Sequence, residues 1–356
     1  MRNINISDIG DGLAMNIETI NGIDIQIDCG SKQNSPHLLN KCYSRRPNVF
    51  FLSHFHSDHY NGLLLASENQ IKLNIENVFF PKLPKFKYDT EFLYCLFAIN
   101  MTLGDFLSNM ETDFLTLIKQ INNRSFEYQA LSQGEKLVVG GESIEILWPP
   151  KELNDNYFLN SVNNALEKFH SALEKDKYLK SNYENIKDTG IIEKYRQDET
   201  TNCEHIENSE FCRKQIDENY KIPKLTKDAN KALRSIANRL SLAFHIDNRF
   251  LFMGDLEATE IKKVVEILVN KQTVSFYTMI TPHHGTHWNN SLIKIKPDIC
   301  ISSIGKRLLR YAKNEYKDIS ETTLWTYLNG DIFIPLGPIY YKRFYYRNWY
   351  PFKYSK

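Results

Sequence analysis

The densest group of side chains able to bind a metal ion lies in one loop, which reads HFHSDH. His54, His56, Asp58 and His59 offer imidazole nitrogens and a carboxylate, the ligand atoms that zinc and similar cations accept. In extended backbone alternate side chains point the same way, so His54 and His56 can reach one ion. Asp58 and His59 would then face a second ion beside the first. Such a dense group predicts a metal centre rather than a polar surface loop.

Further potential ligands follow apolar segments in the second half of the chain. Asp255 comes directly after a run of bulky apolar residues, and a carboxylate at that point can bridge two cations. The same aspartate could cap the helix that follows, and one residue can serve both purposes. His283 and His284 follow the next apolar run, and core packing does not explain such a pair. His287 is interpreted as lining the rim of the same site.

Two other groups of metal-binding residue types are not predicted to form sites. His170 lies in an amphipathic helical pattern, which favours a surface position. Cys203, His205 and Cys212 have a spacing that matches no usual zinc motif, and the sequence offers no clear fourth ligand.

The elements that must position these side chains can be predicted from apolar periodicity and turn residues. Strands are expected over residues 14–20, 23–27, 49–52, 77–80, 238–246, 249–253, 276–280 and 298–302, with a hairpin over 135–148. Helices are expected over most of 89–120, over 257–270 and near 289–295, and one begins after the metal loop with Ser57 or Asp58 as its cap. Asp28 ends the second strand of an opening hairpin that turns at Asn21-Gly22. Residues 151–231 are charge-rich and helix-favouring, which indicates a helical insertion.

Composition narrows the class of protein. The 356 residues carry 44 basic and 43 acidic side chains, so the net charge of +1 indicates no general attraction to nucleic acid or membrane. The six cysteines are scattered, which is typical of a reducing compartment. The chain shows no secretory signal and no apolar run long enough to cross a bilayer, so we expect a cytoplasmic protein without membrane association.

The motifs DCG, HFHSDH, GDLE and PHHG occur in the order found in the metallo-β-lactamase superfamily, which this chain resembles over residues 8–82, 132–150 and 236–305. The resemblance implies an α/β fold, the metallo-β-lactamase αββα four-layer sandwich with a helical insertion. It divides the chain into residues 1–150, the insertion 151–231, residues 232–337 and a tail, 338–356.

The resemblance also implies a role for each motif residue. One ion would be held by His54, His56 and Asp255, and the other by Asp58, His59, Asp255 and His284. The expected cofactor is two Zn²⁺ ions, with Mn²⁺ as the alternative. Asp58 and His283 would be catalytic, Asp58 by orienting a metal-activated hydroxide and His283 by donating a proton to the substrate. Asp28 would support the metal loop by hydrogen bonding.

One superfamily feature is missing, because no histidine occurs between Tyr60 and Phe169. The branch that contains the hydrolase domains of competence-type DNA-uptake proteins and related phosphodiesterases also lacks that histidine. It carries instead an Asn-x-x-Ser strand, which Asn238 and Ser241 match in this sequence. The opening hairpin and the Trp148-Pro149 corner also resemble this branch. We therefore expect Asn238 and Ser241 to lie behind the metal ligands.

The expected function is that of a phosphodiesterase or nuclease acting on DNA or RNA. The tail, residues 338–356, holds five Lys/Arg, nine aromatics and no acid, a composition suited to single-stranded nucleic acid. It could equally pack on the core or on a partner protein. The predicted substrate-binding residues are Lys306, Arg307, Arg310, Lys342, Arg343 and Arg347. Two alternatives stay open: a hydrolase of small esters such as cyclic nucleotides, phosphocholine-type esters or lactones, and a subunit regulated by a protein partner bound to the insertion or the tail.

Overall fold

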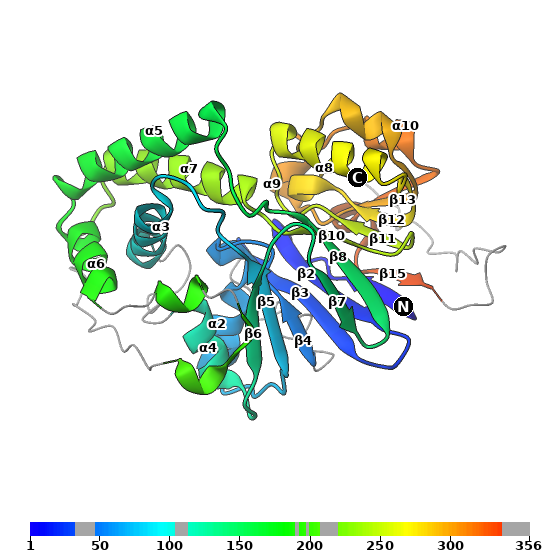
Figure 1. Cartoon of the computed structure of the whole chain (residues 1–356), viewed down its shortest axis with the longest axis horizontal. Helices are drawn as coiled ribbons and strands as arrows, with labels where there is room; N and C mark the ends of the chain where they lie inside the picture. The colour runs from blue at the N-terminus through cyan, green and yellow to red at the C-terminus, as the bar shows by residue number, and fades with distance from the viewer. Residues whose placement is uncertain (33–46, 104–112, 189–191, 197–198, 207–219, 337–356) are drawn as a thin grey trace, which may run out of the picture.

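Two mixed β-sheets face each other, and helices cover their outer surfaces (Figure 1). The computed structural model describes the whole chain except residues 33–46, 104–112, 189–191, 197–198, 207–219 and 337–356. The predicted fold class, an αββα four-layer sandwich, is confirmed. No helix in the described part of the chain is long and apolar enough to span a membrane.

Within the described residues the first sheet has eight strands, in the order β15-β1-β2-β3-β4-β5-β6-β9. Its strands are β1 (Asn3–Ile6), β2 (Gly12–Glu18), β3 (Asp24–Ser31), β4 (Val49–Phe51), β5 (Asn77–Pro81), β6 (Glu127–Leu131), β9 (Thr201–Asn202) and β15 (Ile332–Pro335). The predicted opening hairpin is β2 and β3, which pair antiparallel, and β3 to β6 then run parallel. The parallel strands place the residues that follow β4 and β5 at one edge of the sheet.

The second sheet, in the part of the chain that the structure describes, has seven strands in the order β14-β13-β12-β11-β10-β8-β7. Its strands are β7 (Lys136–Val139), β8 (Glu142–Trp148), β10 (Ala243–Ile246), β11 (Phe250–Phe252), β12 (Ser275–Ile280), β13 (Lys296–Ser302) and β14 (Thr322–Trp325). The hairpin predicted over 135–148 is β7 and β8. Strands β11, β12, β13 and β14 run parallel.

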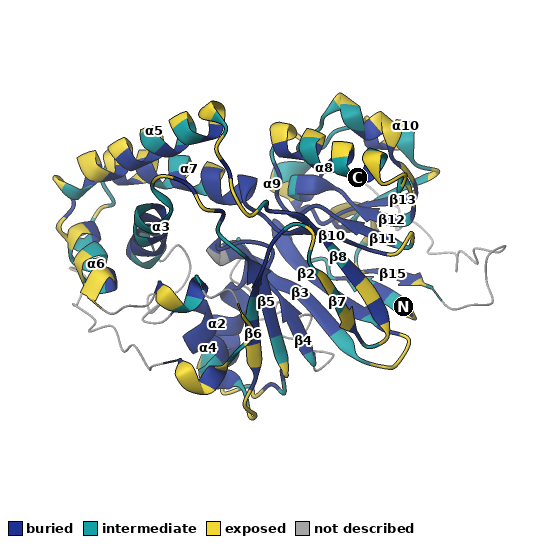
Figure 2. Ribbon diagram, viewed as in Figure 1, coloured by how far each residue is buried: buried dark blue, intermediate teal, exposed yellow. Residues whose placement is uncertain are grey.

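Alternation along β4 shows how the sandwich is built. Val49 and Phe51 pack in the core between the two sheets, whereas Phe50 packs in the core under the helices. Across the sheets the ring of Phe51 lies 5.4 Å from that of Phe244 in β10. Because successive side chains of a strand point to opposite faces, an uninterrupted apolar run is what a strand between two apolar layers requires. Figure 2 shows most of both sheets buried and exposed residues on the outer helices and on β7.

The helices account for the rest of the layers. They are α2 (Asn61–Glu68), α3 (Asp89–Leu103), α4 (Phe114–Ile121), α5 (Asn156–Leu173), α6 (Lys177–Asp188), α7 (Lys224–Arg239), α8 (Ala258–Asn270), α9 (Lys306–Leu309), α10 (Tyr316–Ile319) and α11 (Thr326–Asn329). Short 3-10 turns are η1 (Ser57–His59), η2 (Glu193–Tyr195), η3 (Cys203–His205), η4 (Pro282–Gly285) and η5 (Asn290–Lys294). The helix predicted over 257–270 is α8, and the one expected near 289–295 is the 3-10 turn η5. The helix expected after the metal loop is α2, but its N-cap position is Tyr60 rather than Ser57 or Asp58.

The strand predicted over 238–246 is wrong at its start. Asn238 and Arg239 form the last turn of α7, and β10 begins only at Ala243. The Trp148 indole donates a 2.7 Å hydrogen bond to the backbone oxygen of Arg239, and the Arg239 guanidinium binds Glu260 of α8 at 2.8 Å. The indole thereby gives a donor to one of the carbonyl groups at the end of the helix. Both contacts join residues far apart in the sequence, so a local pattern does not reveal them.

A helical region lies between β8 and β10, and its helix α7 packs against both α5 and α3 (Figure 1). One of its anchors to the sandwich is the buried Arg239–Glu260 ion pair. The Arg239 guanidinium also lies 4.9 Å from the ring centre of Tyr157 and 5.0 Å from that of Phe158, both in α5. The region also adds β9 to the edge of the first sheet.

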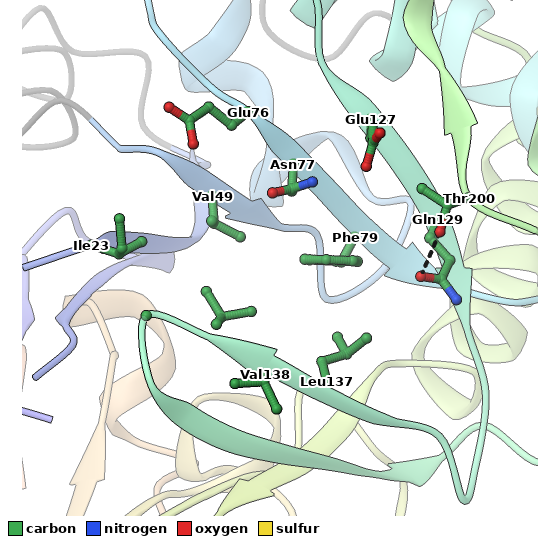
Figure 3. A pocket seen from close by; sticks show the side chains of 12 residues that line it. Ile23, Val49, Glu76, Asn77, Phe79, Glu127, Gln129, Leu137, Val138 and Thr200 are labelled. Carbon is green, nitrogen blue, oxygen red and sulfur yellow. Dashed lines mark hydrogen bonds between the residues drawn. The ribbon is translucent and has the colours of Figure 1, made fainter. Parts of the chain in front are cut away.

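A groove of about 340 Å³ opens where β4, β5 and β6 begin (Figure 3). It is lined by Val49, Asn77 and Glu127 from these strands and by Leu137 and Val138 from β7. Since the histidine loop follows the last residue of β4, the groove lies at the opposite end of the strands from the candidate metal ligands.

Candidate metal centre

The histidine loop is fixed against the end of β3. A Cβ atom added at Gly30 would lie 2.4 Å from the backbone oxygen of Asp58, so the loop approaches β3 more closely than a side chain would permit. Asp28, in the same strand, has a φ of 53°. Four loop residues, His54, His56, Asp58 and His59, are buried. The close contact with β3 therefore holds these four side chains in a buried position.

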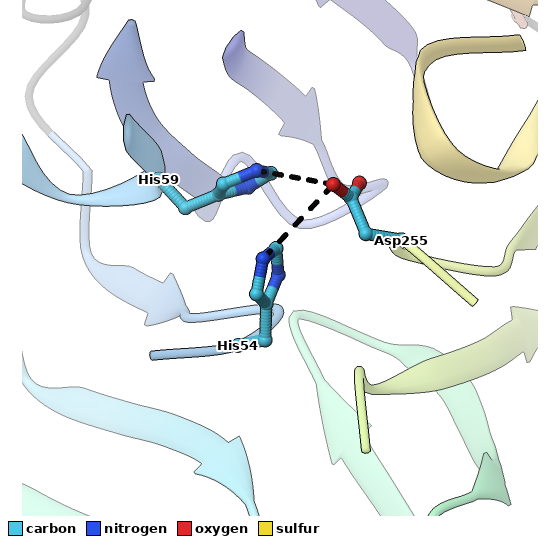
Figure 4. Close-up of side chains that lie close together, drawn as sticks. All are labelled: His54, His59 and Asp255. Atoms are coloured by element: carbon cyan, nitrogen blue, oxygen red, sulfur yellow. Dashed lines mark ion pairs between the residues drawn. The ribbon is translucent and has the colours of Figure 1, made fainter. Parts of the chain in front are cut away.

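His54, His59 and Asp255 form the middle of the site (Figure 4). One ligand atom from each of them lies within 4.8 Å of the others. The Asp255 Oδ2 atom is 4.0 Å from His54 Nε2, 3.6 Å from His59 Nε2 and 3.5 Å from His284 Nε2. A carboxylate oxygen surrounded by three imidazole nitrogens from two separate loops is arranged as a bridge between cations would be.

His56 completes the loop's contribution. Its Nδ1 atom lies 2.7 Å from His54 Nε2, so the two ring nitrogens converge on one point. The other ring nitrogen of His56 is buried and has no hydrogen-bond partner among the described residues, and the same holds for Nε2 of His59. Buried nitrogens without partners are costly unless something binds them, and a divalent cation fits this donor set.

Asp28 holds the loop from behind. Its carboxylate accepts hydrogen bonds from the Ser53 backbone at 2.7 Å and the Ser53 hydroxyl at 2.6 Å, and its Oδ2 atom lies 2.6 Å from His59 Nδ1. Burial would lower the pKa of His59, but the carboxylates of Asp28 and Asp255 raise it to about 10. Asp28 therefore keeps a proton on Nδ1 and turns Nε2 toward Asp255, as a residue supporting a metal ligand does.

His283 and His284 occupy left-handed backbone, with φ values of 49° and 58°. This conformation is unfavourable for residues with side chains and tends to occur at functional sites. The Nδ1 atom of His284 is hydrogen bonded to the Ser303 carbonyl at 2.8 Å, which leaves Nε2 facing Asp255. His283 Nε2 lies 3.8 Å from Asp255 Oδ2. Both rings therefore face the site from the end of β12.

Asp58 has a different environment from the one expected of it. Both carboxylate oxygens contact the Arg234 guanidinium, at 2.9 and 3.2 Å, and Oδ2 lies 3.3 Å from Lys32 Nζ. Burial raises the pKa of Asp58, but these two cations outweigh it and hold the pKa well below its usual range. In this structure Asp58 is thus an ion-pair partner, beside the ligand group rather than within it.

Arg234 and Lys32 were not predicted as site residues. Arg234 comes from the middle of α7, where its sequence context is an ordinary amphipathic helix and gives no signal. Lys32 follows β3 and could have been suspected from its closeness to Asp28. Burial lowers the pKa values of His54 and His56 well below the usual range, and the Arg234 charge adds to this effect.

Asn238 and Ser241 lie beside the strand end that carries Asp255. A Cβ atom added at Gly254 would be 2.7 Å from Ser241 Cβ. Asn238 Oδ1 and Ser241 Oγ are buried without a hydrogen-bond partner. Their expected role behind the metal ligands stays a prediction.

The predicted substrate-binding residues are less concentrated. Lys306, Arg307 and Arg310 are exposed around α9, where Arg307 donates to Asp11 at 2.9 Å and Arg310 lies 4.7 Å from the Tyr311 ring centre. Lys342, Arg343 and Arg347 lie outside the described residues. His170 is exposed and contacts Glu91 at 2.8 Å.

Topology and site can now be set beside known proteins. The fold is the metallo-β-lactamase sandwich. No protein-family model matches the sequence, and no curated protein matches it either. Among solved structures, the metallo-β-lactamase fold protein YhfI from Bacillus subtilis is similar, with a TM-score of 0.36 and 10% identity over 91% of this chain and 96% of that chain.

Two further structures show the same degree of likeness. Tm1679, a metal-dependent hydrolase of the β-lactamase superfamily, has a TM-score of 0.42 and 9% identity over 95% of this chain and 100% of that chain. A long form RNase Z from yeast has a TM-score of 0.38 and 7% identity over 84% of this chain and 37% of that chain. Likeness this distant says nothing of the reaction, and the competence-type branch stays a prediction.

Proposed function

We propose that this protein is a metal-dependent hydrolase of phosphodiesters that binds two divalent cations, with Zn²⁺ as our first choice of metal. The observation that carries the proposal is a buried group of imidazoles around Asp255 with two side-chain cations, Arg234 and Lys32, at its edge. His54, His56 and Asp255 would hold one ion. His59, His284 and Asp255 would hold the other, with Asp58 as the further ligand expected from its motif.

The chemistry that two such ions supply is activation of a water molecule and neutralisation of negative charge on the phosphoryl group. The chain's own residues prepare the site for it. Asp28 and the Ser303 carbonyl fix the ring orientations of His59 and His284, so their Nε2 atoms stay directed at Asp255. Burial lowers the pKa of His283 to about 3, so its neutral ring can offer an N–H to a substrate oxygen.

Arg234 and Lys32 favour an anionic substrate over a neutral ester or lactone. A guanidinium paired with a carboxylate is also shaped to bind a phosphate oxygen. If Asp58 turns to an ion, Arg234 and Lys32 lose their partner and become available to the phosphodiester. A nucleic acid strand remains our first choice of diester, on the composition of the tail, 338–356.

A comparison of anionic and neutral substrates tests this proposal. The protein, reconstituted with Zn²⁺ or Mn²⁺, should hydrolyse bis-p-nitrophenyl phosphate in preference to a neutral nitrophenyl ester. Arg234→Ala should raise KM for the diester roughly 10- to 100-fold, the value of a lost hydrogen bond between charged groups, and Arg234→Lys should restore part of it. Lys231→Ala, an exposed lysine of the same helix, should change neither substrate.

Two results would contradict the proposal. One is a fully metal-loaded protein that cleaves the neutral ester and leaves the diester intact. The other is an Arg234→Ala variant with unchanged KM on the diester and unchanged metal content.

A further inference from the structure

A second group of potential ligands lies outside the buried centre. It consists of Glu257, which precedes α8, and His283 and His287 from the loop after β12. One ligand atom from each of the three lies within 4.8 Å of the others. Glu257 and His287 are not among the ligands proposed for the buried centre, and His283 lies between the two groups, with its Nε2 atom 3.8 Å from Asp255 Oδ2.

The Nδ1 atom of His287 has more polar neighbours than one hydrogen bond can satisfy. It lies 3.0 Å from His283 Nδ1, 3.3 Å from the Leu256 carbonyl oxygen and 3.4 Å from Glu257 Oε2. Whichever imidazole carries the proton between the two rings, His287 Nδ1 makes one directed hydrogen bond, so at least one of the two oxygen atoms faces it without a proton. A cation between the four atoms would instead be bound by all of them.

The spacing of these atoms fits a transition-metal ion. Nitrogen and oxygen ligands about 2.0–2.2 Å from a tetrahedral zinc ion lie roughly 3.3–3.6 Å from one another. The separations around His287 Nδ1 run from 3.0 to 3.4 Å. Small adjustments of the side chains would therefore bring the group to ligand geometry without moving the backbone.

The backbone around the group is held in place. The buried Tyr316 hydroxyl donates to the His287 carbonyl oxygen, and the ring of Trp288 packs edge-on against Tyr316 at 5.1 Å. The Thr286 hydroxyl donates to the His283 carbonyl oxygen at 2.7 Å. The side chains themselves are 23% exposed at His283, 26% at His287 and 31% at Glu257, so an ion can enter from solvent and keep a water.

We propose that Glu257, His283 and His287, with the Leu256 carbonyl, bind an accessory divalent transition-metal ion such as Zn²⁺ at the rim of the buried centre. Two imidazoles and a carboxylate select borderline cations of this class over Mg²⁺ and Ca²⁺. Binding through Nδ1 of His283 would leave the proton on its Nε2 atom, which faces Asp255 at 3.8 Å. This last step rests on the proposed function, whereas the binding of the ion does not.

Counting bound ions tests the site directly. The protein is loaded with Zn²⁺, passed through a desalting column and analysed for metal, and Co²⁺ absorption is measured in parallel. His287→Ala and Glu257→Gln should each bind one equivalent less than the unmodified chain and lose part of the Co²⁺ spectrum. Glu257→Gln keeps the size of the side chain. His170→Ala, which removes an exposed imidazole that also contacts a glutamate, should leave the count unchanged.

A second measurement separates this site from the buried centre. A variant carrying His54→Ala and Asp255→Asn should still bind one Co²⁺ ion, and adding His287→Ala should abolish that binding. The proposal is overturned if His287→Ala and Glu257→Gln, both folded by circular dichroism, bind as many ions as the unmodified chain and bind them equally tightly. That result would leave the proposed hydrolase standing, since its ligands are untouched.

Discussion

The sandwich and the helical region between β8 and β10 contribute to the site in different ways. All five side chains around the buried centre come from loops at strand ends of the sandwich: His54, His56, His59, Asp255 and His284. The helical region brings Arg234 to Asp58. We infer that the sandwich provides the metal-binding side chains and one cation for the substrate, Lys32, while the helical region adds a second cation, Arg234.

The geometry of strand ends explains the first half of this division. β4, β11 and β12 all run parallel to a neighbour, and the ligand loops follow their last residues. β4 belongs to the first sheet and β11 and β12 to the second, and within each sheet the parallel strands bring the residues after them to one edge. The two edges meet at the site, where His54 Nε2 lies 4.0 Å from Asp255 Oδ2. Arg234 depends instead on a helix anchored by the Arg239–Glu260 pair, roughly one and a half turns further along α7.

The largest effect is expected from Asp255→Asn. An amide of the same size cannot bridge two cations, so the two ions of the buried centre should be lost and at most the one ion proposed for the accessory site should remain bound. The value of kcat/KM on a phosphodiester should fall by about a thousandfold or more. Elemental analysis after reconstitution measures the first, and initial rates measure the second. His170→Ala should change neither. Full metal content in Asp255→Asn would show that another residue bridges the ions. It would contradict our inference about which side chains of the sandwich bind them.

A smaller effect is expected from Asp28→Asn, because Asp28 acts through His59. Loss of the negative charge behind the ring should weaken metal binding about 10- to 100-fold, as measured by competition with a chelator of known affinity. Asp155→Asn is the matched control, since Asp155 caps α5 in the helical region and asparagine caps equally well. If both variants weaken binding to the same degree, the two regions are not separate in the way we infer.

Sequence patterns predicted the parts of the structure that depend on local periodicity. Alternating and fully apolar runs located the strands, and the order of the motifs led to the four-layer sandwich. The structure brings the loop histidines, which follow β4 of the first sheet, together with Asp255 and His284, which follow β11 and β12 of the second sheet. Each group follows the end of a short apolar strand, which a sequence pattern can locate, and the order of the motifs indicates that the two sheet ends meet.

Contacts between distant surfaces could not be predicted in the same way. Whether Arg234 reaches Asp58 depends on which side of α7 faces the sandwich, and this is set by packing against α3 and α5. The end of α7 depends on bonds from Trp148 and Glu260, far away in sequence. From the sequence, His287 was interpreted as a rim residue and Glu257 as the start of a helix. Only the fold shows that ligand atoms of His287, Glu257 and His283 lie within 4.8 Å of one another.

The smallest effect concerns the tail, residues 338–356, which lies outside the described residues and was predicted to guide nucleic acid. Replacing Lys342, Arg343 and Arg347 with glutamine should weaken binding of single-stranded DNA. It should also reduce the slope of log affinity against log salt by roughly one unit for each lost phosphate contact. Hydrolysis of bis-p-nitrophenyl phosphate should not change, because that substrate is too small to reach beyond the metal centre and its flanking cations.

The matched control is the replacement of Lys175, Lys177 and Lys180 with glutamine, which removes as much charge from exposed positions of the helical region. If the tail guides the strand, this control should keep the original salt slope. If the tail instead packs on the core, the tail variant should lose thermal stability and both substrates together. A folded tail variant with unchanged DNA affinity would contradict the nucleic-acid role of the tail. Substrate choice would then depend on Arg234 and Lys32 alone, which favours a small diester as substrate or a hydrolase regulated by a partner protein.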